Sequence, residues 1–234
     1  MPVKHSALFC AIPAVLFVLT AGASPALSAE PNRWEPAITQ FESLDAVNPP
    51  SPGAILFIGS SSIRMWKTLA EDMAPMRVIN RGFGGSGIGD AVQYAGRIVF
   101  PYSPSKIVFY SGENDIAAGQ TPKQVSATFE QFVELVGGKL PGVPIYYVSM
   151  KPSVLRWNMW GGMREGNRLI REYCATRPGL TFVDVSAGMM DSSGMVRKDI
   201  FIEDNLHMNA AGYAVWTGII RPLLLKDGGS GPAK

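Results

Sequence analysis

The sequence contains few cysteines and histidines, which are frequent ligands of transition metals and, in the case of cysteine, form disulfide bonds. Its 234 residues include two cysteines and two histidines, and both Cys10 and His5 lie in an N-terminal segment that we expect to be removed. Cys174 would then be the only cysteine of the mature chain, which excludes an intramolecular disulfide. We expect this thiol to be buried or half-buried on a helix rather than to act as a nucleophile. No Cys/His cluster has the spacing of a metal site, so no metal ion is expected.

Charge and long apolar runs are also sparse. Charged residues make up 17% of the chain, and the formal net charge is +2. No cluster of Lys and Arg indicates binding to nucleic acid, so no nucleic acid is expected as a partner. Beyond the N-terminal segment no apolar run is long enough to span a membrane, so we expect no stable membrane span in the mature chain. The length and the 47% hydrophobic content are typical of one globular domain with a substantial core.

Residues 1–29 have the pattern of a secretory signal peptide. Lys4 and His5 provide a positive start, and residues 7–21 form an apolar run that is too short to span a bilayer comfortably. Ala26-Leu27-Ser28-Ala29 is a plausible cleavage site, and Ala21-Gly22-Ala23 is a second one. The alternative is an uncleaved membrane anchor, which the small residues after the run disfavour. We therefore expect a secreted or periplasmic protein.

The remainder divides into three segments by composition. Residues 30–53 contain five prolines and are interpreted as an N-terminal lead-in with a short helix near residues 37–44. Residues 54–225 alternate short apolar segments with helical patterns and form the predicted domain. Residues 226–234 are rich in glycine and are expected to be a flexible tail.

Within the domain, short apolar segments alternate with amphipathic ones. The predicted strands are 54–58, 77–80, 106–110, 144–149 and 181–185, and the predicted helices are 63–73, 88–99, 122–136, 163–177 and 210–225. Thr121, Pro122 and Gln124 form a capping box for the third helix, and Gly137-Gly138 is expected to end it. Because strands that alternate with helices form parallel sheets covered on both faces, we predict an α/β fold: a three-layer sandwich around five parallel strands.

The stretch from Ile55 to Arg64 places serines at the carboxyl edge of this sheet. Four large apolar residues are followed by Gly59 and by three serines, at positions 60–62. A strand, a tight turn and a helix start present a side chain at the edge where α/β proteins bind ligands, close to N–H groups that favour negative charge. A serine nucleophile needs this environment, although serines also suit turns and helix caps.

His207 is the only histidine that the mature chain would retain, and a serine nucleophile needs such a base. Asp204 precedes it by three residues and can orient the ring. Gly85, in a glycine-rich loop, and Asn114, after the third strand, can offer N–H donors to an oxyanion. Each residue taken alone also fits a turn or a cap, but their joint occurrence at separate strand ends favours a hydrolase.

Four blocks of the sequence resemble the SGNH or GDSL-type esterase superfamily, which is named for Ser, Gly, Asn and His in separate blocks. The blocks are Phe57-Ile58-Gly59-Ser60-Ser61-Ser62, Asn80-Arg81-Gly82-Phe83-Gly84-Gly85, Gly112-Glu113-Asn114-Asp115 and Asp204-Asn205-Leu206-His207. Their order and spacing resemble the family across residues 54–225.

The resemblance implies a flavodoxin-like fold and a carboxylic ester hydrolase without a metal or organic cofactor, and the signal-peptide pattern adds the expectation that this hydrolase is secreted. It implies Ser61 as the nucleophile and His207 as the base, to which the spacing of three residues adds Asp204 as the partner of His207. It also implies an oxyanion hole made by the N–H groups of Ser61 and Gly85 and by the side chain of Asn114. The implied reaction removes an acyl or acetyl group from a small-molecule or glycan ester.

Two positions depart from the family pattern. Ser60 stands where an aspartate is usual, and Ser86, after the second block, stands where an aspartate is frequent. Neither change removes a catalytic group, but both can alter the rigidity of the loops or their contacts with a substrate.

Two other functions match parts of the sequence. Gly82-x-Gly84-x-x-Gly87 fits a dinucleotide-binding pattern, but it follows the second strand, and no acidic residue ends a strand about 20 positions later. A non-catalytic glycan- or ligand-binding module on the same fold would use Trp157 and Trp160 to stack on a sugar. In an esterase the same two tryptophans would line the substrate pocket, form a lid, or serve only packing.

Overall fold

The computed structural model describes Met1 and residues 33–226, and the chain divides into two units, Met1–Arg33 and Trp34–Lys234. Apart from Met1, the predicted signal peptide lies outside the described residues, and so does the predicted tail beyond residue 226. Every element named below belongs to the second unit. Among the described residues, no helix is both long and apolar enough to cross a membrane.

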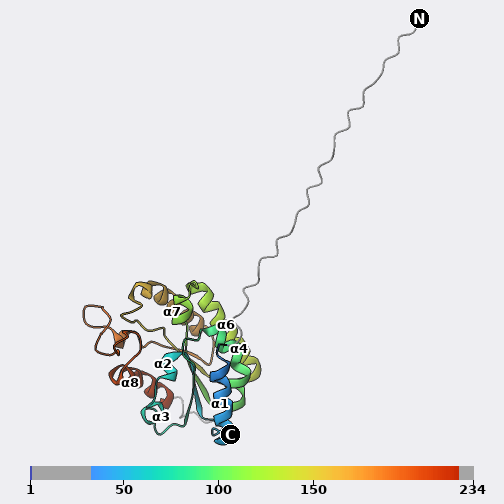
Figure 1. The fold of residues 1–234 in the computed structure, drawn as a ribbon, viewed down its shortest axis with the longest axis vertical. Helices are drawn as coiled ribbons and strands as arrows, with labels where there is room; N and C mark the ends of the chain where they lie inside the picture. Colours follow the sequence, from blue (N-terminus) through green and yellow to red (C-terminus); the bar gives the residue numbers. More distant parts are fainter. Residues whose placement is uncertain (2–32, 227–234) are drawn as a thin grey trace. The chain divides into compact units, whose positions relative to one another are not determined.

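Five parallel strands form one sheet in this unit (Figure 1). The strands are β1 (Ile55–Gly59), β2 (Val78–Gly82), β3 (Lys106–Tyr110), β4 (Ile145–Val148) and β5 (Leu180–Val183). Their order is β2-β1-β3-β4-β5, and every neighbouring pair is parallel. This is the flavodoxin-like order, in which the connections reverse direction between β1 and β3. The predicted fold class is therefore confirmed.

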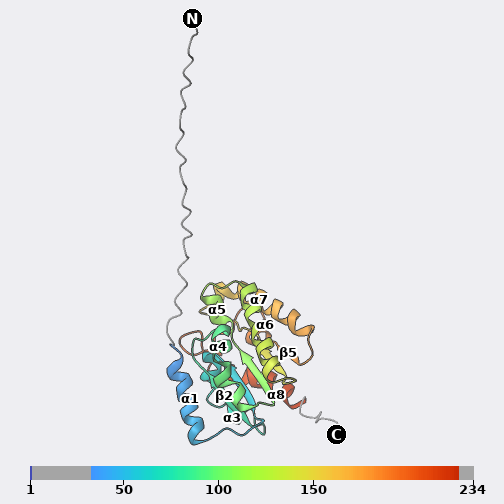
Figure 2. The ribbon, with the colours of Figure 1, turned by 90° about the vertical axis from the view of Figure 1, so that its right-hand side faces the viewer.

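Helices cover both faces of the sheet. In chain order they are α1 (Glu35–Val47), α2 (Ser61–Arg64), α3 (Leu69–Asp72), α4 (Ile88–Ile98), α5 (Glu113–Ala117), α6 (Pro122–Lys139), α7 (Trp160–Ala175) and α8 (Ala210–Lys226). Short 3-10 turns lie at Phe100–Tyr102, Trp157–Met159 and Ala187–Met189. Figure 1 shows α1, α4 and α6 on one side of the sheet and α3 and α8 on the other. In Figure 2 the two edge strands of the sheet, β2 and β5, lie apart from each other.

The side chains of β1 alternate between two apolar cores. Leu56 and Ile58 face the core formed with α1, α4, α6 and α7, whereas Ile55 and Phe57 face the core formed with α2, α3 and α8. All four are at most 5% exposed. A strand buried on both faces must be apolar at every position, which explains the uninterrupted run that predicted it.

The segment before the first strand contributes to the core. It was predicted to hold only a short helix near 37–44, but α1 spans thirteen residues, and Ile38 is fully buried. Trp34 packs edge to face on Phe83 with ring centroids 5.7 Å apart. Pro36 lies in the first turn, where its missing N–H costs no helical hydrogen bond.

The prediction of one helix over residues 63–73 is wrong, because the chain forms two short helices there, α2 and α3. Between α2 and α3, Trp66 turns inward and is 1% exposed, with its Nε1 donating to Asp72 Oδ2 at 2.5 Å. Its ring packs on Phe57, Tyr213 and Trp216. Burial of this large side chain outweighs the helical pattern of the surrounding residues.

Other boundaries differ by smaller amounts. The Thr121 capping box of α6 is confirmed, since Thr121 Oγ1 accepts from the Gln124 N–H and Gln124 Oε1 accepts from the Thr121 N–H. The glycines at 137–138 do not end α6, which continues to Lys139. Helix α7 begins at Trp160, three residues earlier than predicted, and α5 was not predicted.

Cys174 is buried on α7, as the sequence indicated, with 4% of its surface exposed. Burial raises the pKa of its thiol to about 12, so this cysteine is protonated and unreactive at neutral pH.

Candidate active site

The predicted serine turn lies at the end of β1, beside the point where the sheet connections reverse direction. Gly59 of β1 is in register with Gly82 of β2 and Tyr110 of β3, so the loops after these three strands begin at the same edge. Gly59 has φ +147°, and a Cβ atom there would lie 1.8 Å from the carbonyl oxygen of Tyr110. Only glycine fits this approach, and it allows Ser61 to begin α2 directly above the strand.

The three serines of this turn are not equivalent. Ser60 is 3% exposed and Ser62 is 2% exposed, whereas Ser61 is partly accessible. Ser61 Oγ lies 2.9 Å from Nε2 of His207, although 146 positions separate the two residues. The structure therefore brings together the serine and the histidine that the sequence singled out. As the first residue of α2, Ser61 also has a backbone N–H that the helix does not use.

Asp204 lies against the other ring nitrogen of His207. Its Oδ2 is 2.5 Å from Nδ1, and its Oδ1 accepts the backbone N–H groups of Leu206 and His207 at 2.9 and 2.8 Å. Because a carboxylate can only accept, Nδ1 carries the ring proton, and Nε2 is left to accept the proton of the Ser61 hydroxyl. These contacts have the geometry of a serine, histidine and aspartate triad.

The environment of Asp204 keeps it ionised. Burial acts to raise its pKa, but the hydrogen bonds from the His207 ring and from the two backbone N–H groups outweigh that effect and lower the pKa to about 2. The carboxylate is therefore negatively charged throughout the neutral range and can stabilise a protonated imidazole.

Asn114 follows β3 and is held by two partners. Its Nδ2 donates to the carbonyl oxygen of Ser86 at 2.9 Å, and its Oδ1 accepts from Nη2 of Arg156 at 2.9 Å. Gly85, the second predicted oxyanion donor, precedes Ser86 in the same loop and has φ +79°. Ser86, one of the two departures from the family pattern, is fully buried, and its carbonyl oxygen accepts the hydrogen bond that orients the asparagine side chain.

A buried ionic cluster beside Asn114 was missed by the sequence analysis. Glu113 accepts from Lys151 Nζ at 3.0 and 3.1 Å and from Arg156 Nη1 at 3.4 Å, and it is 3% exposed. Tyr110 also donates to Glu113, and burial raises the pKa of Tyr110 well above its ordinary value, so the phenol remains a donor. A signal was present, because Glu113 and Lys151 are charged residues just beyond buried strands, at the edge where sites form.

The glycine-rich loop does not have the anion-binding helix start of a dinucleotide site. Asp90 accepts the N–H of Gly87 at 2.7 Å, and Asp115 accepts the N–H of Ile88 at 3.0 Å. A Cβ atom on Gly87 would lie 2.6 Å from Asp115, so this glycine makes room for the carboxylate. Because two carboxylates already occupy the start of α4, the loop disfavours a pyrophosphate there.

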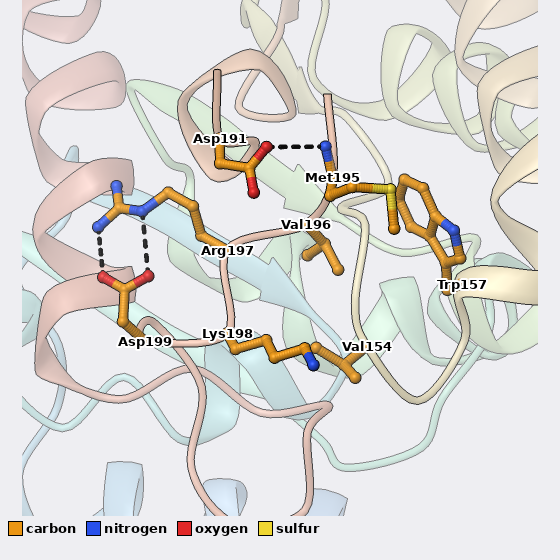
Figure 3. Close-up of a pocket in the computed structure, with 8 residues that line it drawn as sticks. All are labelled: Val154, Trp157, Asp191, Met195, Val196, Arg197, Lys198 and Asp199. Atoms are coloured by element: carbon orange, nitrogen blue, oxygen red, sulfur yellow. Dashed lines mark hydrogen bonds and ion pairs between the residues drawn. The ribbon is translucent and has the colours of Figure 1, made fainter. Parts of the chain in front are cut away.

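The two tryptophans differ in position. Their rings stack at 6.4 Å, but Trp160 is 9% exposed and belongs to the apolar core. Trp157 lines a pocket of about 560 Å³, shown in Figure 3. In that view the side chain of Met195 lies beside the Trp157 ring, and Lys198 extends toward Val154. The lining residues are Val154, Trp157, Asp191, Met195, Val196, Arg197, Lys198 and Asp199.

This pocket adjoins the loops that carry the site. In the chain, its Val154 and Trp157 lie on either side of Leu155 and Arg156. The N–H of Leu155 donates to the carbonyl oxygen of Asn205 at 3.0 Å, and Asn205 lies between Asp204 and His207 in the sequence. Within residues 33–226, no group of three or more His, Cys, Asp or Glu side chains is arranged to hold a metal ion.

A parallel α/β sandwich with these serine, glycine, asparagine and histidine positions defines a protein of the SGNH class. The model of the GDSL-like lipase/acylhydrolase family matches residues 57–215, and the chain belongs to that family. This membership supports a hydrolase that acts on esters.

Named relatives agree with this assignment. Human platelet-activating factor acetylhydrolase IB subunit alpha1 is 26% identical over 181 residues, which cover 74% of this chain and 75% of the human protein. A GDSL-like lipase from Bacteroides thetaiotaomicron superposes with a TM-score of 0.69 at 17% identity, covering 81% of this chain and 98% of its own. A catalytic mutant of an acetylxylan esterase from Geobacillus stearothermophilus gives 0.60 at 16% identity over 79% and 98%. At these identities the two structures show that the fold is shared.

Proposed function

We propose that this protein is an exported serine esterase that removes a short acyl group from an alcohol through a covalent acyl-enzyme. The observation that carries the proposal is the chain of contacts from Ser61 Oγ to His207 Nε2 and from His207 Nδ1 to Asp204, at the carboxyl edge of the sheet. In such an arrangement a weakly nucleophilic hydroxyl becomes reactive, because an adjacent base can accept its proton.

The acylation step begins at Ser61. Its oxygen attacks the ester carbonyl carbon while its proton moves to Nε2 of His207, and the ring then carries two protons beside the charged Asp204. The tetrahedral intermediate collapses, the carbon–oxygen bond to the alcohol breaks, and the departing alkoxide takes the proton from His207. The acyl group remains on Ser61 as an ester.

Deacylation repeats these steps with water as the nucleophile. His207 accepts a proton from water as the hydroxide attacks the acyl carbon. The second tetrahedral intermediate then expels the Ser61 oxygen, which recovers the proton from the ring. A carboxylic acid leaves, and the site returns to its starting state.

Three donors would stabilise the negative oxygen of both intermediates. They are the backbone N–H of Ser61, the first residue of α2, the backbone N–H of Gly85 in the loop after β2, and the side-chain Nδ2 of Asn114 after β3. Donors fixed before the reaction stabilise charge without reorganising, and removal of one typically costs about 100- to 1,000-fold in rate.

The pocket beside Trp157 is the proposed site for the alcohol part of the substrate. The names of the human relative and of the Geobacillus enzyme both refer to acetyl groups, which supports a short acyl group here. A pocket of about 560 Å³ is larger than an acetyl group needs, and it lies on loops that carry Arg156 and lead to His207. Its lining combines apolar side chains, among them Trp157 and Met195, with the charged side chains of Asp191, Arg197, Lys198 and Asp199. This combination suits an alcohol that has an apolar or ring-containing part and polar substituents.

Acetyl esters with alcohols of increasing size test this assignment. Trp157→Ala should raise KM for large alcohols and leave small acetyl esters little changed. Leu155→Ala is the matched control, because Leu155 lies on the same loop, is 60% exposed and does not line the pocket. Equal effects of Trp157→Ala on every alcohol would remove the pocket from the proposal.

Hydrolysis of p-nitrophenyl acetate tests the function itself. The wild-type protein should release nitrophenol, and Ser61→Ala should not. A glycan-binding module would instead bind acetylated oligosaccharides without turnover, and Ser61→Ala would bind them equally well. Stable binding with no release of acetate from any ester in the series would favour that alternative.

A further inference from the structure

The orientation of the Asn114 side chain is fixed by chemistry on both sides. Arg156 can only donate and the Ser86 carbonyl can only accept, so the oxygen of the amide must face Arg156 and its nitrogen must face Ser86. The opposite orientation would place N–H against N–H and oxygen against oxygen. One N–H of Asn114 is committed to Ser86, which leaves the second as the group that can bind an oxyanion.

Arg156 is itself held in place from several directions. Its guanidinium reaches Glu113 through Nη1 and Asn114 through Nη2, and its side chain is 17% exposed. The backbone N–H of Arg156 donates to Ser153 Oγ at 3.3 Å, and the preceding residue bonds to the loop of the histidine. The arginine therefore joins the loop after β4 to the loop after β3.

The cluster has one more positive charge than negative charge. Lys151 and Arg156 each contribute one cation, and Glu113 contributes the only carboxylate that contacts them among the described residues. Lys151 is 1% exposed and Glu113 is 3% exposed, so water screens these charges poorly. Arg156 donates directly to the amide oxygen of Asn114, so the excess positive charge lies next to that amide. A cation on the amide oxygen draws electron density from the nitrogen and strengthens its N–H as a donor.

We propose that Arg156 is a positioning residue for the esterase reaction: it holds the amide of Asn114 in the donor orientation and adds positive charge behind it. This inference rests on the proposed function, because it assumes that Asn114 binds the oxyanion. Arg156 acts on the transition state through the asparagine and does not touch the substrate. Its loss should consequently lower kcat and leave KM nearly unchanged.

Kinetics of four variants test the proposal on p-nitrophenyl acetate: Arg156→Gln, Arg156→Lys, Asn114→Ala and the double variant Arg156→Gln/Asn114→Ala. Arg156→Gln should lower kcat by about 10- to 100-fold, with KM within about twofold of wild type. Arg156→Lys keeps the charge without the fork of donors and should give an intermediate kcat. The double variant should be no more than about threefold slower than Asn114→Ala, since both changes remove the same contribution.

Arg168→Gln is the matched control. Like Arg156, this arginine has two side-chain partners, which here are Glu165 and Glu172, but it lies on the exposed face of α7. It should leave kcat unchanged. Thermal unfolding of each variant identifies any loss that comes from misfolding, and Arg156→Lys provides the test if Arg156→Gln does not fold.

The possible failures are distinguishable. If the losses of Arg156→Gln and Asn114→Ala multiply in the double variant, or if Arg156→Gln changes only KM, Arg156 does not act through the asparagine and the inference is overturned while the esterase function stands. If Asn114→Ala keeps the wild-type kcat, the oxyanion role of Asn114 is wrong and the inference falls with it. If the wild-type protein hydrolyses no ester, the proposed function itself is overturned.

Discussion

At the residue scale, neighbouring positions of the same type differ in what surrounds them. Ser60 and Ser62 are buried, whereas Ser61 is partly accessible and contacts His207. The spacing from Gly59 favoured Ser61 in the sequence, but three consecutive serines left the choice to family resemblance. Exposure and a histidine contact across 146 positions could come only from the folded chain.

Asp204 and the charged cluster show the same limit. A spacing of three residues allowed Asp204 to reach His207, and the loop places it there. The contact of Arg156 with Asn114 joins residues 42 positions apart through two loops, and no local pattern encodes it. The sequence therefore indicated the residues at strand ends but not the pairing between loops.

Replacing Asp204 by Asn should lower kcat by up to about 10,000-fold, because asparagine does not hold the ring in the tautomer that leaves Nε2 free to accept. Steady-state kinetics on p-nitrophenyl acetate measure the change. Asp184→Asn is the control, since Asp184 is a solvent-accessible partner of Arg171 and does not line the pocket. A rate for Asp204→Asn equal to that of the control would show that another group orients His207.

The same carboxylate predicts a pH dependence of stability. Its pKa of about 2 in the folded chain lies below the ordinary value of 3.8, so the unfolded chain binds this proton more readily. The stabilisation by Asp204 is therefore fully present above about pH 4 and is lost as the pH falls toward 2. In thermal melts, the difference in Tm between the wild-type protein and Asp204→Asn should narrow as the pH falls over this range. A difference in Tm that stays constant would contradict the lowered pKa.

At the element scale, segments governed by local capping or by burial on both faces followed the sequence. The five strands and the Thr121 capping box are examples. The region from Ile63 to Met73 did not, because Trp66 gains more from the core shared with Tyr213 and Trp216 than from a continuous helix. Those partners lie about 150 positions away, beyond the reach of any local pattern.

Helix α1 gives a prediction at this scale. Ile38 is fully buried against the core of the domain, so Ile38→Ala should lower the free energy of unfolding by about 2–4 kcal/mol without changing kcat. Leu44→Ala on the same helix is the control, because Leu44 is 59% exposed and should cost little. Denaturant unfolding measures both. Equal stability of the two variants would show that α1 is not part of the cooperative core.

At the scale of the whole molecule, the alternation of strands and helices predicted the α/β sandwich, since few topologies satisfy right-handed crossovers between parallel strands. The order β2-β1-β3-β4-β5 places the serine and asparagine loops on either side of the point where the connections reverse. The flavodoxin-like arrangement of the strands was predicted from the resemblance to the SGNH superfamily. Composition and periodicity alone do not fix which strand lies next to which.

Export is a property of the whole chain and remains a prediction. Expressed in a bacterium with a periplasm, the protein should be recovered there with its N-terminus at residue 30, after the Ala26-Leu27-Ser28-Ala29 site. An N-terminus at residue 24 would favour the second cleavage site. A chain that lacks residues 2–29 should stay in the cytoplasm and keep its esterase activity. Recovery of the full-length chain from the membrane fraction would indicate an uncleaved anchor instead.

Labelling with a serine-directed phosphonate tests the central claim most directly. The account predicts one covalent adduct on the wild-type protein, located at Ser61 by tandem mass spectrometry, with activity lost in proportion to labelling. Ser61→Ala should form no adduct, and His207→Ala should form it far more slowly because the hydroxyl lacks its base. An adduct on Ser60 or Ser62, or full esterase activity in Ser61→Ala, would contradict the account.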